Sequence, residues 1–150
     1  MRTIPLITSL LLLLLPGLAS AQEAPPAQLP RTAAPGDAMA YILSPSDGAE
    51  VRSPFTVRFG LRGMGVAPAG VQAPDTGHHH LLINVDDLPD ESVPLPATDS
   101  IRHFGKGQTE TELDLAPGEY RLQLTLGDAL HIPHSPPVRS EIVTITVAAP

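Results

Sequence analysis

Hydrophobic and polar side chains alternate strictly in several stretches of this chain, and this period of two limits the fold more than any other feature. In the stretch 55–61, Phe55, Val57 and Phe59 alternate with polar residues. Alternation over such lengths is typical of β-strands that bury one face. The sequence therefore predicts strands at 55–61, 79–85, 109–115, 119–126 and 142–147, with shorter strands at 40–43 and near Val51.

No window of the sequence shows a helical period, and 18 Pro and 12 Gly residues disfavour long helices. Six or seven strands in a chain of this length predict an all-β fold, and we expect an immunoglobulin-like antiparallel β-sandwich of about seven strands. A small barrel or a jelly roll is the alternative. The turn Ala116-Pro117-Gly118-Glu119 has Pro and Gly where a type II turn needs them, which predicts a hairpin between 109–115 and 119–126.

The apolar faces of these strands predict the core. Met39 alternates with Tyr41 and Leu43 on the first short strand, which predicts a core position for Met39 on the face that it shares with them. The other predicted core residues are Phe55, Phe59, Leu81, Ile83, Leu122, Leu124, Val143, Ile145 and Val147.

The chain opens with a segment typical of protein export. Residues 1–21 combine Arg2, an apolar run and the small residues Ala19-Ser20-Ala21, which predicts a signal peptide cleaved after Ala21. Residues 22–38 are rich in Pro and Ala and are expected to form a flexible tether, followed by one β-sandwich domain at 39–150. We therefore expect a periplasmic or secreted protein without a membrane span.

Charge and composition exclude several classes of partner. The formal net charge is −7, and the loss of Arg2 with the leader would make it −8. Lys and Arg are scattered, so nucleic acid and anionic membrane surfaces are not expected partners. The chain has no cysteine, which excludes thiolate chemistry and iron–sulfur clusters.

Three consecutive histidines lie at the start of a predicted strand. His78 and His80 would share one face about 6.5–7 Å apart, a spacing from which two imidazoles can converge on one metal ion. His79 would share the other face with Leu81 and Ile83, which predicts a core position. A buried, hydrogen-bonded histidine is the ordinary structural interpretation of any one of these residues.

The histidines lie in, or at the margins of, three long loops rich in Gly, Pro and Asp, at 62–77, 86–104 and 127–140. His131 and His134 are three residues apart, and Pro133 between them excludes a regular helix. His103 precedes Phe104-Gly105-Lys106-Gly107, a turn in which the backbone can approach a ligand closely.

Imidazole groups in a chain without cysteine suit Cu²⁺, Zn²⁺ or Ni²⁺. We predict a copper or zinc site with the ligands His78, His80, His103, His131 and His134. Met64 is a candidate soft ligand for Cu⁺, although a core position is its ordinary interpretation. The acidic neighbours that could complete or orient the ligand set are Asp75, Asp86, Asp87 and Asp128.

The histidine-bearing segments resemble a known family. Gly77 to Ile83, His103 to Glu110, and Gly127-Asp128 followed by His131 to His134 are similar to the bacterial domain family numbered 4399, a domain of unknown function whose members are small exported proteins. The resemblance runs from about Tyr41 to Val147. It implies the identity of the domain and its export, and it brings no activity with it.

Three functional hypotheses follow from these observations. The first is an exported domain that binds copper or zinc through the histidines, for carriage or buffering. The second is a non-enzymatic module whose histidines form a structural network or a pH-sensitive pocket for a small ligand or another periplasmic protein. The third is a metal-dependent enzyme with Glu110 or Asp128 as the general base, for which the sequence predicts no specific catalytic residue set.

Overall fold

The described part of the chain consists of β-strands joined by turns and loops. The computed structural model describes residues 29–149, so the expected signal peptide and residues 22–28 lie outside the described part. The described residues form no helix, so none of them belongs to a helix that could cross a membrane. The strands are β1 (Met39–Ser44), β2 (Glu50–Val51), β3 (Phe55–Arg62), β4 (Gly65–Val66), β5 (Thr76–Ile83), β6 (Ile101–His103), β7 (Glu110–Leu113), β8 (Gly118–Gly127) and β9 (Val143–Val147).

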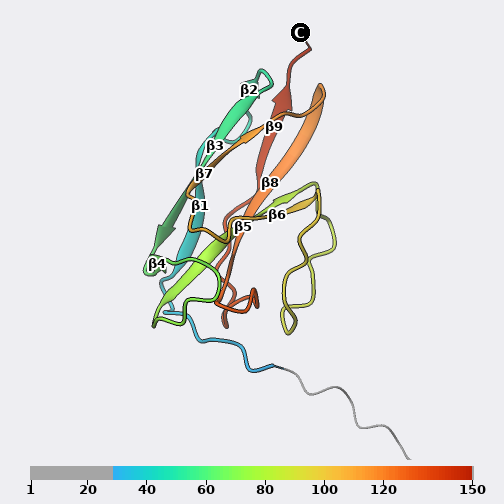
Figure 1. The fold of residues 1–150 in the computed structure, drawn as a ribbon. Helices are drawn as coiled ribbons and strands as arrows, with labels where there is room; N and C mark the ends of the chain where they lie inside the picture. The colour runs from blue at the N-terminus through green and yellow to red at the C-terminus, as the bar shows by residue number, and fades with distance from the viewer. Residues whose placement is uncertain (1–28, 150) are drawn as a thin grey trace, which may run out of the picture.

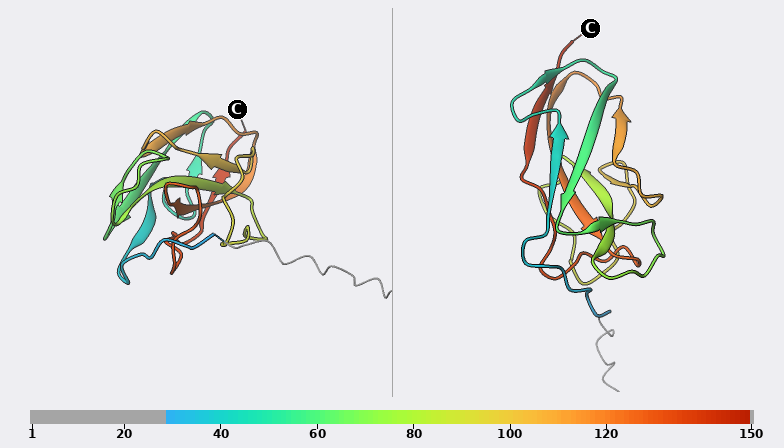
Figure 2. Two further views of the ribbon diagram at one scale, coloured as in Figure 1. Left: turned by 60° about the horizontal axis from the view of Figure 1, so that its bottom comes forward. Right: turned by 90° about the vertical axis from the view of Figure 1, so that its left-hand side faces the viewer.

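The strands form two packed sheets, one of order β1-β3-β7 and the other of order β2-β9-β8-β5-β4, with β6 also pairing with β5. Figure 1 shows the first sheet on the left and the β9-β8-β5-β6 layer on the right, and Figure 2 gives two further views. The predicted all-β sandwich is confirmed. Pairing is mainly antiparallel, with short parallel pairs between β2 and β9 and between β4 and β5. The closer likeness to immunoglobulin domains stays a prediction.

The core lies between the sheets, where each strand contributes alternate side chains. Of the nine core residues predicted on the longer strands, Phe55 is half-buried and the others are buried. The buried members of that set are Phe59, Leu81, Ile83, Leu122, Leu124, Val143, Ile145 and Val147.

The predicted inward face of β1 is wrong. Met39, Tyr41 and Leu43 are exposed, while Ala40 is fully buried and points toward the core. Both faces of this strand are apolar, so alternation alone could not assign them. The outward-facing ring of Tyr41 covers Gly60 on β3, because a Cβ on Gly60 would lie 2.2 Å from that ring.

The predicted hairpin between 109–115 and 119–126 is also wrong. β7 pairs with β3, whereas β8 pairs with β5 and β9, so the turn at Pro117 carries the chain from one sheet to the other. Proline and glycine specify a tight reversal of direction, but they do not specify whether the two strands hydrogen-bond to each other.

β5 is buried on both faces. Leu81 and Ile83 face the core, and His78, His80 and Leu82 on the opposite face are also buried. The loops after β5 and β8 lie against this outer face, at the lower end of the molecule in Figure 1, and the Leu95 amide donates to the His131 carbonyl at 2.8 Å. These two loops explain how polar imidazoles come to be enclosed on the outer side of a sheet.

Contacts with the domain begin before Met39. Within the segment expected to be a tether, Arg31 donates from Nε to the Pro133 carbonyl at 3.0 Å, and the Ala34 amide donates to the Ser135 carbonyl at 3.0 Å. Arg31 also forms an ion pair with Glu91 at 3.0 Å, and Glu91 in turn pairs with Arg139 at 2.6 Å. These contacts connect the chain entry to both loops that cover β5.

Candidate metal centre

Four histidines from three separate parts of the chain converge at the outer face of β5. One ring nitrogen from each of His78, His80, His103 and His131 lies within 4.8 Å of those of the other three. In the described residues 29–149, no other group of three or more His or carboxylate side chains is gathered in this way. We call these four residues the histidine cluster.

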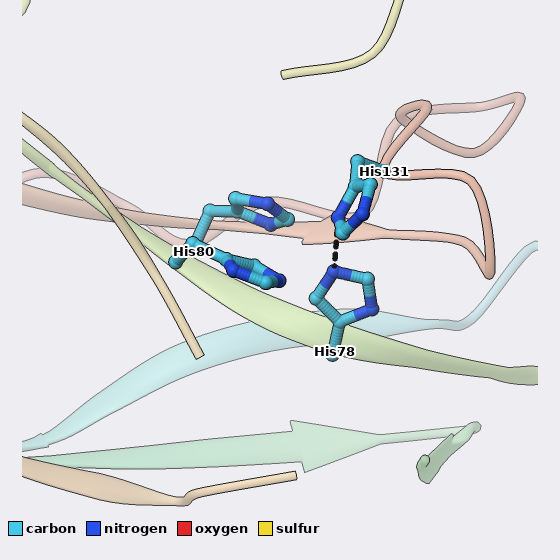
Figure 3. Close-up of side chains that lie close together, drawn as sticks. His78, His80 and His131 are labelled. Atoms are coloured by element: carbon cyan, nitrogen blue, oxygen red, sulfur yellow. Dashed lines mark hydrogen bonds between the residues drawn. The ribbon is translucent and has the colours of Figure 1, made fainter. Parts of the chain in front are cut away.

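The spacing within the histidine cluster suits a shared ion. Two nitrogens bound to one zinc ion at about 2.0–2.1 Å in tetrahedral geometry are about 3.3 Å apart. His78 Nε2 and His131 Nδ1 lie 3.0 Å apart and share a hydrogen bond, and Figure 3 shows these two rings facing each other with His80 beside them. The four nitrogens lie close enough together that the group could hold one metal ion.

Two of the strands explain why three of the four rings meet. Alternation on β5 places His78 and His80 on one face, with ring centroids 4.8 Å apart, as the sequence predicted. The antiparallel pairing of β5 with β6 places His103 directly opposite His80, with centroids 5.1 Å apart. β6 has only three residues and no alternation, so its pairing could not be predicted from the sequence.

The fourth ligand is held by a tight turn after β8. His131 has a left-handed backbone with φ of 67°, and its amide donates to the Asp128 carbonyl at 2.9 Å. Asp128 Oδ1 accepts the amides of Leu130 at 2.8 Å and Ile132 at 3.0 Å, while Oδ2 accepts the Thr32 hydroxyl at 2.6 Å. The carboxylate of Asp128 therefore fixes the turn that presents His131.

Burial lowers the pKa of three members of the histidine cluster. Burial, followed by repulsion from His131 and His103, lowers the pKa of His78 from 6.5 to about 4. Burial and the neighbouring imidazoles lower the pKa of His80 to about 3. Burial and His131 also lower the pKa of His103, which is the most exposed of the four. Neutral imidazole is the form that binds metal, so burial favours the metal-binding form of these three rings at pH 7.

Two histidines lie outside the histidine cluster. The structure does not bring the predicted ligand His134 into it: the fully buried ring lies with Nε2 3.2 Å from the Thr76 carbonyl and Nδ1 3.5 Å from the Leu126 carbonyl. His79 faces the core, as expected, with its ring centroid 5.3 Å from that of Phe59. Neither ring nitrogen of His79 has a hydrogen-bond partner in the protein.

The other candidate ligands and bases are engaged elsewhere. Met64 packs against the hydrophobic core. Asp86 forms an ion pair with Arg121, and Glu110 on β7 pairs with Arg58 at 3.1 Å on the other sheet. Oδ1 of Asp128 accepts amides of its own turn and Oδ2 accepts the Thr32 hydroxyl, so this residue acts by positioning His131 rather than by binding directly.

The fold and the site define a class: a β-sandwich that gathers four imidazoles on the outer face of one sheet. A family model described as Domain of unknown function (DUF4399) matches residues 57–148, a range that includes the whole histidine cluster. The chain belongs to this family, as its histidine-bearing segments predicted. No curated protein and no solved structure matches the chain.

Proposed function

We propose that this domain binds one transition metal ion, copper or zinc, through His78, His80, His103 and His131. The observation that carries the proposal is the convergence of four ring nitrogens within 4.8 Å of one another. Imidazole is the ligand type shared by zinc and copper sites, and four such ligands are enough for a complete coordination shell.

The chemistry of the ligand set favours divalent ions. The chain has no cysteine, and Met64, the methionine considered as a ligand, packs against the hydrophobic core. Soft sulfur ligands select Cu⁺, whereas nitrogen ligands suit Cu²⁺ and Zn²⁺. Among these ions Cu²⁺ binds most tightly to a nitrogen site, so we expect it to outcompete Zn²⁺ at equal concentration.

The proposed role is carriage or buffering of the ion outside the cytoplasm. A carrier needs a closed ligand set and a route for exchange, and here two ligands are fully buried while His103 is exposed. Export rests on the expected leader at residues 1–21, which lie outside the described part of the chain.

A hydrogen-bonded histidine network without metal is the second candidate. The 3.0 Å contact between His78 and His131 favours it. In a structural network, however, buried ring nitrogens are expected to be paired. Both ring nitrogens of His80 and Nδ1 of His78 have no hydrogen-bond partner in the protein. A bound metal ion would coordinate ring nitrogens of His78 and His80 that a hydrogen-bonded network leaves without a partner.

Thermal unfolding separates the two candidates. Zn²⁺ or Cu²⁺ added to the metal-free mature chain at about pH 7.5 should raise the melting temperature, because an ion that binds only the folded state at a hundredfold excess over its dissociation constant stabilises it by about 2.7 kcal/mol. The double variant His78→Ala/His80→Ala should lose the shift, and His134→Ala should keep it.

His134→Ala is the matched control because it removes a buried imidazole outside the histidine cluster. If that variant does not fold, His79→Leu takes its place. A metal shift that survives in the double variant would place the ion elsewhere, and a wild-type chain without a shift would favour the network.

A further inference from the structure

The four ligands differ in how firmly the fold holds them. His78 and His80 project from the middle of β5 and are fully buried, and the turn built by Asp128 holds the half-buried His131. His103 is exposed and ends the three-residue strand β6. Resting on the proposed function, we infer that His103 is the exchangeable ligand through which the ion enters and leaves, and that Gly105 positions its ring.

Gly105 lies directly against the imidazole of His103. A Cβ at this position would lie 2.2 Å from Cε1 and 2.4 Å from Nε2 of the ring, and the next nearest atom is Cβ of Ala69 at 3.3 Å. The backbone at Gly105 is fixed, because its carbonyl accepts the Ala69 amide at 2.9 Å. The absence of a side chain is therefore what allows the ring to lie in its present place.

Alanine is compatible with the backbone at position 105. Gly105 is not among the described glycines with positive φ, so a Cβ there creates no backbone strain. The only severe contact is with the end of an exposed side chain, which can rotate into solvent. Gly105→Ala should therefore displace one ligand while the remaining structure is preserved.

Gly127 provides the matched contrast on the other side of β5. A Cβ there would lie 2.8 Å from Cε1 of His80 and 3.3 Å from the backbone carbon of His131. The ring of His80 is buried and has no solvent to rotate into. The same substitution at Gly127 should therefore disturb the fixed part of the site and the fold together.

Accessibility makes His103 the point of exchange. Ligand replacement at labile ions proceeds one donor at a time, and a ring in contact with solvent can be replaced by an incoming donor before a buried ring can. His103 also borders a shallow surface depression that an incoming donor could occupy, lined by Ala97, Thr98, Asp99, Ile101 and Arg102.

The test measures transfer of Cu²⁺ from the loaded chain to excess EDTA by stopped-flow absorbance. Gly105→Ala and His103→Ala should release the ion at least about 10-fold faster than wild type. Gly105→Ala should lower the affinity about 10- to 100-fold, as is usual when a group that orients a metal ligand is changed. The metal-free melting temperatures of both variants should stay near the wild-type value. Gly127→Ala should lower both that temperature and the affinity.

Electron paramagnetic resonance and rescue by imidazole distinguish positioning from a general structural effect. The Cu²⁺ spectra of Gly105→Ala and His103→Ala should each show one coordinated nitrogen fewer than that of the wild type. Free imidazole should restore the slow release in His103→Ala. Unchanged release rates in both variants would overturn the inference. So would complete loss of binding in His103→Ala, which would make His103 as essential as His78. Wild-type protein that takes up no ion would overturn the proposed function as well.

Discussion

At the scale of single residues, His79 is an unfavourable side chain for a position in the core. It is fully buried, neither ring nitrogen has a protein partner, and burial lowers its pKa from 6.5 to about 4. A buried polar group without a partner carries its full desolvation cost, whereas an apolar group of similar size does not.

We therefore expect His79→Leu to raise the metal-free free energy of unfolding by about 1–3 kcal/mol. Urea denaturation at about pH 7.5 measures this, and the stabilisation by metal should be unchanged because His79 lies outside the histidine cluster. A fall in stability would mean that the imidazole packs better against Phe59 than leucine can.

Residue identity predicted part of the site. His78 and His80 could be placed together because alternation on a strand has a fixed geometry. His131 and His134 could not be told apart, because nothing in a loop sequence fixes which ring turns toward the strand. In the structure, the hydrogen bonds of Asp128 hold the turn with the left-handed backbone at His131, and this turn directs the His131 ring toward β5.

At the scale of elements, long alternating segments were predicted well and short ones were not. β3, β8 and β9 differ from the predicted strands by at most one residue at either end. β4 and β6 fall within segments expected to be loops, because strands of two or three residues show no period. Their pairing with β5 depends on contacts distant in sequence, and β6 supplies one ligand.

Sheet membership was the other feature that local patterns could not supply. The β7–β8 turn and the apolar β1 strand each satisfied a local rule, and in both cases the arrangement of the two sheets decided the outcome. Which face of β1 is inward depends on what lies across the sandwich, and β1 contacts β8 there.

At the scale of the whole molecule, the buried histidines make stability depend on pH. His78 and His79 have folded-state pKa values of about 4 and His80 of about 3, all below the ordinary value of 6.5. Between the folded-state pKa values and the ordinary value of 6.5, the unfolded chain binds more protons than the folded chain. The free energy of unfolding therefore rises with pH over this range.

We expect metal-free protein to lose stability steadily as the pH falls from about 6.5 toward 4. Urea denaturation at a series of pH values measures the slope, and His79→Leu should reduce it by the contribution of one proton. A curve that is flat over this range would show that the histidines are protonated in the folded state.

X-ray absorption spectroscopy tests most directly whether four imidazoles bind one ion. The sample is the chain loaded with one equivalent of Cu²⁺ or Zn²⁺ at about pH 7.5. The account predicts nitrogen ligands at about 2.0 Å with the multiple scattering of three to four imidazole rings. The control His134→Ala should give the same spectrum, and His78→Ala/His80→Ala should not. A shell of oxygen atoms with at most one imidazole, or an unchanged spectrum in the double variant, would contradict the account.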